Sequence, residues 1–454
     1  MYRPSCPGPI DRREFLRVGG LALGGLALSD VLAARAVGGQ RRDTSVILVY
    51  CSGGASQLET YDLKPDGPER MRSVFRPIAT RVPGMSICEL FPLQAQVADR
   101  FSLIRSLHHK INIHNDGSIN VLTGKEPTVL DPTSQARSEH PDFGMIAGRM
   151  RGPHRESLPQ YVSIPGPFHM TRPTYLGSAY QAFGTGNVAY AGWSPAQLSL
   201  RGQSPRELDD RRRLLNQLDQ LQSQADQTEA ERGMGEFQRQ AFDVLTSPAV
   251  ARAFDLSRED PRLRDRYGRH LWGQGLLLAR RLAEAGTAVI SLVANTPDNG
   301  PDFTNWDDHP GNAMRPGHFA HYIRVRLPYF DQSVSALIED VFARGLDERV
   351  LIVVVGEFGR TPQLRVGPPD QSIGRDHWPD AYSALISGGG LRMGEVIGAT
   401  DARGAYPSET PVTPQDLLAT IYRHLGIDPT HTFTDATGRP IPILPHGTPI
   451  RQLI

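Results

Sequence analysis

Acidic and imidazole side chains follow apolar runs at several places in this 454-residue sequence. The clearest pair is Asp307 and His309, in the motif Asn-Trp-Asp-Asp-His. A carboxylate and an imidazole at this spacing can reach one divalent cation, although so short a motif also arises by chance. Its position after the apolar run 287–293 favours a metal site.

Glu357 stands at the end of another apolar run, 350–355, in the motif Gly-Glu-Phe-Gly-Arg-Thr-Pro. Solvation explains a carboxylate at the end of a buried strand poorly, so we weigh a ligand role against a structural ion pair with Arg360. A later motif, Gly-Arg-Asp-His-Trp-Pro, supplies His377. This imidazole is either a ligand or a ring that Asp376 orients.

Three histidines, His108, His109 and His114, lie within seven residues, and we expect at least one of them to be a ligand or an acid/base group. Nearer the amino terminus, Glu59 and Asp62 share a face if their segment is helical and are otherwise solvated acids.

All these candidate ligands donate oxygen or nitrogen, and none donates sulfur. Such a set suits zinc, manganese, magnesium or calcium and does not discriminate among them. The predicted metal ligands are Asp307, His309, Glu357, His377, Glu59 and Asp62, and the predicted catalytic groups are His114, Arg360 and Arg375.

The candidate residues can converge only if the apolar runs are strands of one sheet. The run 45–50 is rich in β-branched residues, as in strands buried on both faces, and it ends at a glycine pair. Similar runs occur at 101–104, 287–293, 350–355 and 382–386, and helical segments such as 269–285 lie between them. This alternation predicts an α/β fold with a mainly parallel central sheet flanked by helices, which gathers ligands at its carboxyl edge.

We expect one domain over residues 37–454. Residues from about 125 to 200 are rich in Pro, Gly and Ser and predict a loop-rich excursion over the sheet. Residues from about 204 to 232 are charged, with leucines at helical spacing, and predict a helical insertion, either a long surface helix or a helical hairpin.

Residues 1–36 have the three parts of a twin-arginine signal peptide. Arg12 and Arg13 precede a Gly/Ala/Leu run at 18–32, and Ala34-Arg35-Ala36 offers a cleavage site. The run is shorter than the roughly 20 apolar residues that span a bilayer. We therefore expect export to the periplasm or beyond, the alternative being an amphipathic first helix.

The charge balance bears on possible partners. The chain has 49 basic and 49 acidic residues, which gives no electrostatic case for binding nucleic acid or an anionic membrane. No segment after residue 36 is apolar for long enough to span a membrane. Cys51 and Cys88 are the only cysteines after the leader and could form at most one disulfide.

Taken together, the leader, the Ser-Gly-Gly after the first run, Trp-Asp-x-His, Gly-Glu-Phe-Gly-Arg-Thr-Pro and Gly-Arg-Asp-His-Trp-Pro resemble the domain-of-unknown-function 1501 family of exported bacterial proteins. The resemblance covers nearly the whole chain. It implies an alkaline phosphatase-like fold, shared with the sulfatases, and a metal site at the strand ends. Asp307 and His309 then resemble the Asp/His pair on one metal, Glu357 stands where a strand-end Asp is found, and His377 resembles a late histidine ligand.

Departures from the superfamily pattern affect the expected mechanism. His114 falls where a sulfatase has its modified cysteine when the segment 114–124 is aligned on its Thr-Gly, which excludes a formylglycine mechanism on that alignment. Ser52 stands where the superfamily has a metal-ligating Asp, and Gln57 and Glu59 replace an expected His and Asp.

Two functions remain open at this point. The first is a metal-dependent hydrolase of phosphate or sulfate esters, with water or His114 as nucleophile and Arg360 or Arg375 neutralising a small anionic substrate. The second is a non-catalytic module that binds a glycan or a protein on the same fold. A structural envelope protein is neither supported nor excluded.

Overall fold

The first apolar run forms strand β1 (Ser45–Tyr50), and all its residues are buried. The structure is a computed structural model that describes residues 43–193, 247–300, 302–311, 316–368, 371–435 and 437–454. Strand β1 pairs in parallel with β7 (Val289–Val293) on one side and with β8 (Val350–Val355) on the other. The run predicted to be buried on both faces is thus a central strand.

An eight-stranded sheet forms the centre of the fold, in the order β14-β4-β13-β8-β1-β7-β5-β6. Only β13 runs against its neighbours, so the sheet is mainly parallel and the predicted α/β class is confirmed. The remaining strands are β14 (Val396–Ile397), β4 (Ser102–Leu107), β13 (Tyr382–Gly388), β5 (Tyr161–Ile164) and β6 (Phe183–Gly184).

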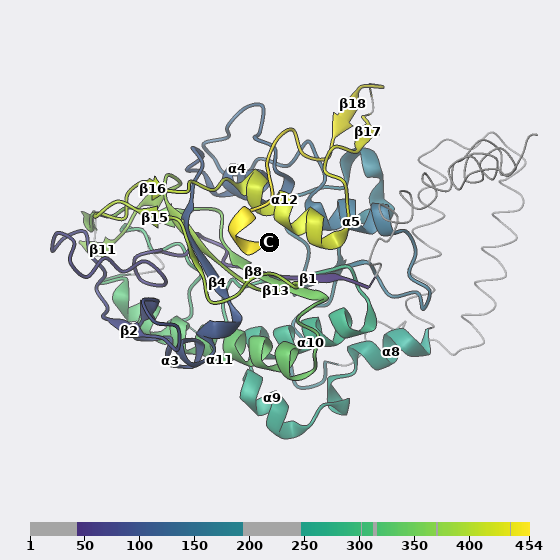
Figure 1. Cartoon of the computed structure of the whole chain (residues 1–454), viewed down its shortest axis with the longest axis horizontal. Coiled ribbons are helices and arrows are strands. Elements are labelled where there is room, and N and C mark those ends of the chain that lie inside the picture. Colours follow the sequence, from purple (N-terminus) through teal and green to yellow (C-terminus); the bar gives the residue numbers. More distant parts are fainter. Residues whose placement is uncertain (1–42, 194–246, 301, 312–315, 369–370, 436) are drawn as a thin grey trace, which may run out of the picture. The chain divides into compact units, whose positions relative to one another are not determined.

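Helices cover both faces of this sheet (Figure 1). On one face lie α4 (His114–Thr123), α5 (Phe143–Arg151) and α12 (Pro414–Leu425), and on the other lie α3 (Pro92–Gln96), α10 (Leu271–Ala285) and α11 (Ala320–Ala343). Alternate residues of β1 contribute to the two cores. Ile47 and Val49 pack in the cluster with α10 and α11, whereas Val46 and Leu48 pack in the cluster with α5 and α12.

Helix α10 shows how the local sequence sets its bounds. His270 precedes the helix and its ring accepts from the backbone N–H of Gly273, and Gly286 ends the helix with φ 102°. A left-handed residue at this position favours glycine. The predicted helix at 269–285 is therefore present with nearly the predicted ends.

The structure describes only part of the segments for which we predicted a domain organisation. Residues 1–36 and 204–232 lie outside the described residues. The predicted excursion at 125–200 contributes α5, β5 and β6 to the body of the fold, and most of its other described residues lie in turns and loops. The described residues from 43 to 454 belong to one compact unit.

Shorter elements complete the described chain. Helices α8 (Pro248–Phe254) and α9 (Pro261–Tyr267) pack against α10. Two-stranded ribbons pair β2 (Pro77–Ala79) with β3 (Ser86–Cys88), β9 (Gly359–Arg360) with β12 (His377–Trp378), β10 (Arg365–Gly367) with β11 (Ser372–Gly374), β15 (Ala399–Thr400) with β16 (Pro407–Glu409), and β17 (Thr432–Thr434) with β18 (Pro440–Pro442). The 3-10 turns are η1 (Ala98–Arg100), η2 (Thr174–Leu176), η3 (Ser178–Tyr180), η5 (Leu256–Arg258) and η6 (Arg451–Leu453).

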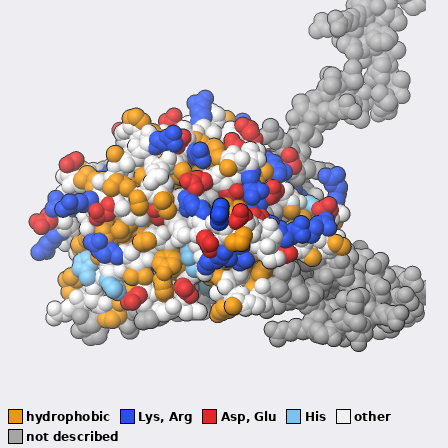
Figure 2. Space-filling view, turned by 90° about the horizontal axis from the view of Figure 1, so that it is seen from below, with side chains coloured by type: hydrophobic (Ala, Val, Ile, Leu, Met, Phe, Trp, Pro, Cys, Tyr) orange, Lys and Arg blue, Asp and Glu red, His pale blue; other side chains and the backbone are white. Residues whose placement is uncertain are grey.

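The surface agrees with the balanced composition. Acidic and basic side chains are interspersed on the face shown in Figure 2. Among the described residues, no helix has both the length and the apolar character needed to cross a membrane. Cys51 and Cys88 are both buried free thiols, so they do not form the disulfide that their number allowed.

Candidate metal centre

The candidate ligands meet at the carboxyl edge of the parallel strands. His114 is the first residue of α4, which follows β4, and Asp307 and His309 lie in the segment after β7. Glu357 follows β8. His377 comes before β13, but β13 is antiparallel, so the start of that strand lies at the same edge. The sheet thereby gathers side chains from four separate segments.

Asp307 is the centre of the cluster. Its Oδ1 lies 3.3 Å from Nε2 of His114 and 3.1 Å from Nε2 of His377, and its Oδ2 lies 3.2 Å from Nε2 of His309. The Asp307 side chain is 15% exposed, so the cluster is open to solvent on one side. Three imidazole nitrogens therefore converge on one carboxylate.

Hydrogen bonds on the far side of each ring determine which nitrogen carries the proton. Nδ1 of His377 lies 2.8 Å from the carbonyl oxygen of Asn112, and Nδ1 of His309 lies 2.9 Å from that of Pro310. A carbonyl oxygen only accepts, so both Nδ1 atoms donate and a neutral ring has its lone pair on Nε2. Nδ1 of His114 faces Oε1 of Glu357 at 2.8 Å in the same way.

A lone pair on Nε2 that faces a carboxylate oxygen places two acceptors against each other. Either a proton on Nε2 or a cation between the two atoms removes this repulsion. Two ligands at 2.0–2.1 Å from a tetrahedral zinc ion lie roughly 3.3 Å apart, close to the separations of 3.1–3.3 Å between Asp307 and the three rings. The residues present therefore fit a bound divalent cation.

One ligand atom each from His114, Asp307 and His377 lies within 4.8 Å of the others. Imidazole nitrogen is a good ligand for zinc and a poor one for magnesium and calcium, which prefer oxygen. The nitrogen-rich set therefore favours zinc among the four predicted ions. His309 lies on the other oxygen of Asp307, outside this group of three, and would have to move closer to become a further ligand.

The protonation of these groups reflects their mutual contacts. Burial opposes a charge on His114, but its hydrogen bonds to Asp307 and Glu357 outweigh burial and raise its pKa to about 9. Burial of the His377 ring lowers its pKa, although Asp307 acts in the opposite direction. The bond to Asp307 raises the pKa of His309. Burial works to raise the pKa of Asp307, but the three rings and Arg360 hold it well below its usual range.

Glu357 contacts His114 directly, so its position suits orienting this ring better than binding a cation. Its Oε1 accepts from the backbone N–H of Gly53 at 2.8 Å as well as facing His114. Its Oε2 is buried and has no hydrogen-bond partner among the described residues. The carbonyl of Glu357 lies 2.6 Å from Nε2 of His109, whose Nδ1 accepts from Ile111. His109 thus fixes the backbone of Glu357 and is not itself in the cluster.

Glu59 and Arg375 lie apart from this cluster, in an ion pair of their own. Arg375 is 0% and Glu59 1% exposed, and Nη2 of the arginine lies 3.0 Å from Oε1 of the glutamate. The remaining N–H groups of Arg375 are used by Glu59 and by the carbonyl oxygens of Thr361, Pro362 and Arg72. Every N–H group of Arg375 already has an acceptor, so this arginine has no donor left for a substrate. Glu59 is too buried to reach a cation in the cluster. The structure therefore corrects the predicted catalytic role of Arg375 and the predicted ligand role of Glu59.

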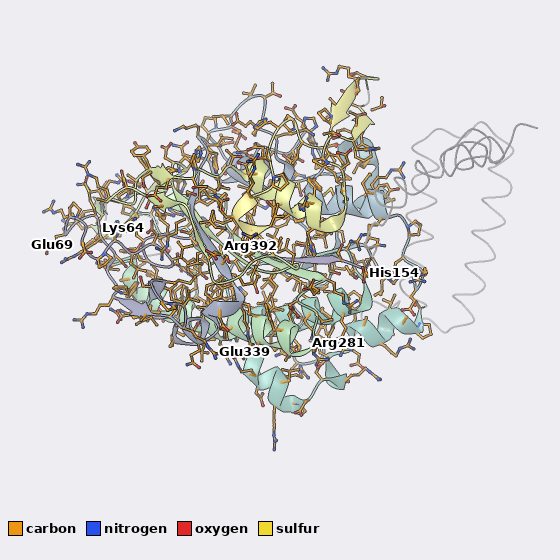
Figure 3. The ribbon with its side chains drawn as sticks, viewed as in Figure 1. Lys64, Glu69, His154, Arg281, Glu339 and Arg392 are labelled. Carbon is orange, nitrogen blue, oxygen red and sulfur yellow. The ribbon has the colours of Figure 1, made fainter. Side chains whose placement is uncertain are left out.

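Asp62 and Asp376 also differ from their predicted roles. Asp62 accepts from Thr400 and pairs at 3.1 Å with Lys64, so it is not part of the cluster. Figure 3 labels Lys64 on the ribbon. Asp376 pairs with Arg365, and the Asn112 carbonyl orients His377 in its place.

Two contributors were not predicted from the sequence. The ring of Phe358 packs 4.5 Å from the ring of His377 and 5.1 Å from that of His114, and forms the floor beneath both. The glycine pair after β1 makes room for this floor. A Cβ on Gly54, at φ 81°, would lie 2.6 Å from Phe358, and one on Gly53, at φ 112°, would lie 2.5 Å from the backbone of Asp307. The sequence shows this glycine pair at the end of the first apolar run but does not reveal its role beneath the site.

Comparisons with known proteins give a family but no activity. A family model described as "Protein of unknown function (DUF1501)" matches residues 43–454. UDP-glycosyltransferase 2 from Phaeomoniella chlamydospora is 36% identical over 89 residues, and the match covers only 19% of this chain and 19% of that relative.

Three solved structures show low similarity to this chain. They are the PsFucS1 sulfatase from Pseudoalteromonas sp. (12% identity, TM-score 0.38, 88% of this chain and 70% of that one), the phosphonate monoester hydrolase SpPMH from Silicibacter pomeroyi (14%, 0.34, 86% and 74%) and a protein in the alkaline phosphatase superfamily from Vibrio parahaemolyticus (12%, 0.35, 85% and 67%). Similarity at these scores assigns no activity.

Proposed function

This chain belongs to the DUF1501 family, and from its site we propose that it is an exported metal-dependent hydrolase of phosphate or sulfate esters. The observation that carries the proposal is the convergence of the Nε2 atoms of His114, His309 and His377 on Asp307. The Nδ1 atoms of all three rings are held by acceptors on the far side. A bound cation accounts for neutral rings whose lone pairs face a carboxylate, whereas charged rings donate to that carboxylate instead.

The residues of the site would have separate roles in holding the cation. His377 and His309 would hold the cation through nitrogens whose tautomers are fixed by backbone carbonyls, and Asp307 supplies the anionic ligand. His114 does the same with Glu357 behind it, in the carboxylate–histidine arrangement typical of metal sites. A divalent cation bound there supplies Lewis-acid polarisation of an ester oxygen and a lowered pKa of water.

The substrate class follows from the resemblance of the motifs to the alkaline phosphatase and sulfatase superfamily. His114 stands at the start of α4, at the position of the sulfatase cysteine on that alignment, and both of its ring nitrogens face carboxylates. Because a histidine held in this way is a ligand, the nucleophile we propose is water. A small phosphate or sulfate ester would bind at the side of Asp307 that is open to solvent.

The test of this proposal starts from metal content. Purified protein is analysed for metal and titrated with Zn²⁺, and turnover of aryl phosphates, aryl phosphate diesters and aryl sulfates is measured. His377→Ala should abolish both binding and turnover, whereas His431→Ala, at an exposed histidine outside the cluster, should change neither. A wild-type protein that binds no metal and turns over none of the three classes would sink the proposal. Metal binding without turnover would support the non-catalytic binding module.

Export is a separate part of the proposal and rests on residues 1–36. The paired arginines, the short apolar run and the small-residue site support a twin-arginine leader. A fusion of residues 1–45 to a reporter that functions only after export in folded form should be active, and Arg12→Lys with Arg13→Lys should abolish its export. Equal export of both fusions would contradict the twin-arginine route.

A further inference from the structure

The guanidinium of Arg360 touches three of the segments that carry the candidate metal centre. Its Nε donates to the carbonyl of Gly54 at 2.9 Å, and its Nη1 donates to that of Arg375 at 3.2 Å. Its Nη2 donates to the carbonyls of Gly53 and Trp306 and lies 2.8 Å from Oδ1 of Asp307. The side chain is 0% exposed, so none of these bonds competes with solvent.

Each of the three segments contributes to the site. The exit of β1 includes the N–H of Gly53, which holds Glu357. The segment after β7 contains Asp307 and His309. The segment that contains Arg375 leads within two residues to His377. One planar group with a rigid fork of donors therefore fixes the distances among all three.

Arg360 is itself held firmly in place. Its backbone N–H donates to Oε1 of Gln57 at 2.9 Å, and its carbonyl accepts from Nε2 of the same side chain at 2.9 Å. The preceding Gly359 admits no side chain, because a Cβ there would lie 2.2 Å from the carbonyl oxygen of Ala381. Because Arg360 is held both at its backbone and at its guanidinium, it can fix the positions of the loops that it contacts.

We propose that Arg360 is a positioning residue of the metal centre: it holds the β1 exit, the Asp307 segment and the approach to His377 in register, and it does not bind substrate. This replaces the anion-neutralising role that the sequence suggested. It rests on the proposed function, because the geometry that Arg360 fixes matters for a bound cation.

The experiment is a Co²⁺ titration of the full chain, with visible absorption and thermal unfolding as parallel readouts. Arg360→Lys keeps the charge but loses the fork, and should weaken Co²⁺ binding about 10–100-fold and change the ligand-field spectrum. Arg280→Lys is the matched control. Arg280 is another 1% exposed arginine, paired with Glu259, Glu284 and Asp340 away from the site. It should lower the unfolding temperature and leave Co²⁺ affinity and spectrum unchanged.

Other outcomes decide between the proposals. If Arg360→Lys is less stable but binds Co²⁺ with wild-type affinity and spectrum, Arg360 is only structural and the inference is wrong. The inference is also wrong if Arg360→Lys and Arg360→Gln both fail to fold while Arg280→Lys folds. A wild-type protein that binds neither Co²⁺ nor Zn²⁺ instead refutes the proposed function.

Discussion

Two pairs of an arginine and a carboxylate lie in the loops that follow the central strands, and they differ in what else the carboxylate touches. In the Glu59–Arg375 pair, the carboxylate meets only hydrogen-bond donors, from Arg375, Ser56 and Val74. Both side chains are almost fully buried. The pair is closed.

The Asp307–Arg360 pair is open on one side. Arg360 donates a hydrogen bond to Oδ1 of Asp307. The other described side chains around this carboxylate offer three imidazole nitrogens, and each can donate to it only when its ring is charged. A carboxylate surrounded by donors stabilises the fold, whereas one surrounded by other potential ligands is suited to a cation. The partners, more than the residue types, separate structural from functional pairs.

The largest expected effect is on the closed pair. Glu59→Gln leaves Arg375 buried without its counter-charge and should lower the free energy of unfolding by about 3–5 kcal/mol. Denaturant unfolding measures this loss. Zn²⁺ affinity of the folded fraction should stay at the wild-type value, and a loss of affinity would contradict the division between the two pairs.

The open pair should show the reverse pattern. Asp307→Asn removes the anionic ligand and should weaken Zn²⁺ binding by about 100-fold or more. Changes to residues that only orient a metal ligand typically cost about 10–100-fold, and loss of a ligand should cost at least as much. Competition with a chromogenic chelator measures the affinity. A substitution that left affinity intact but destabilised the fold as strongly as Glu59→Gln would show that Asp307 is structural.

Proton competition should appear only at the open pair. The pKa of His114 is raised to about 9, above its unfolded value, so the stability gained from its charged form is present below pH 6.5 and is lost as pH rises through about 9. Metal needs the neutral ring, so Zn²⁺ affinity should rise about tenfold per pH unit between pH 6.5 and 8.5 for each proton released. Titration calorimetry in two buffers measures the protons. Glu59→Gln should keep this slope, and a flat profile in the wild type would contradict it.

The smallest expected effect distinguishes orienting from binding. Glu357→Gln keeps an acceptor for Nδ1 of His114 but removes the negative charge, and should weaken Zn²⁺ binding about tenfold. Stability should fall only where the His114 ring is charged, because the charged ring then loses its carboxylate partner, and should hold above about pH 9, where the ring is neutral. An effect as large as that of Asp307→Asn would make Glu357 a direct ligand.

The sequence predicted the edge of the sheet at which the side chains meet, because parallel strands end together and Asp307 and Glu357 follow two of them. It could not distinguish Glu59 from these residues, since the Arg375 that neutralises it comes from a segment far along the chain. The direction of β13 was also hidden. His377 precedes that strand and would lie at the opposite edge if β13 were parallel. Local patterns do not encode which distant segment supplies a partner.

The ligands come from segments that run from His114 to His377, and only the assembled sheet brings them together. No short fragment of the chain can therefore form the site, and a cation that binds it crosslinks segments far apart in sequence. Binding of the proposed cation would favour the folded chain over the unfolded one by mass action, and the supply of the ion would then affect how long the protein survives heat and proteases.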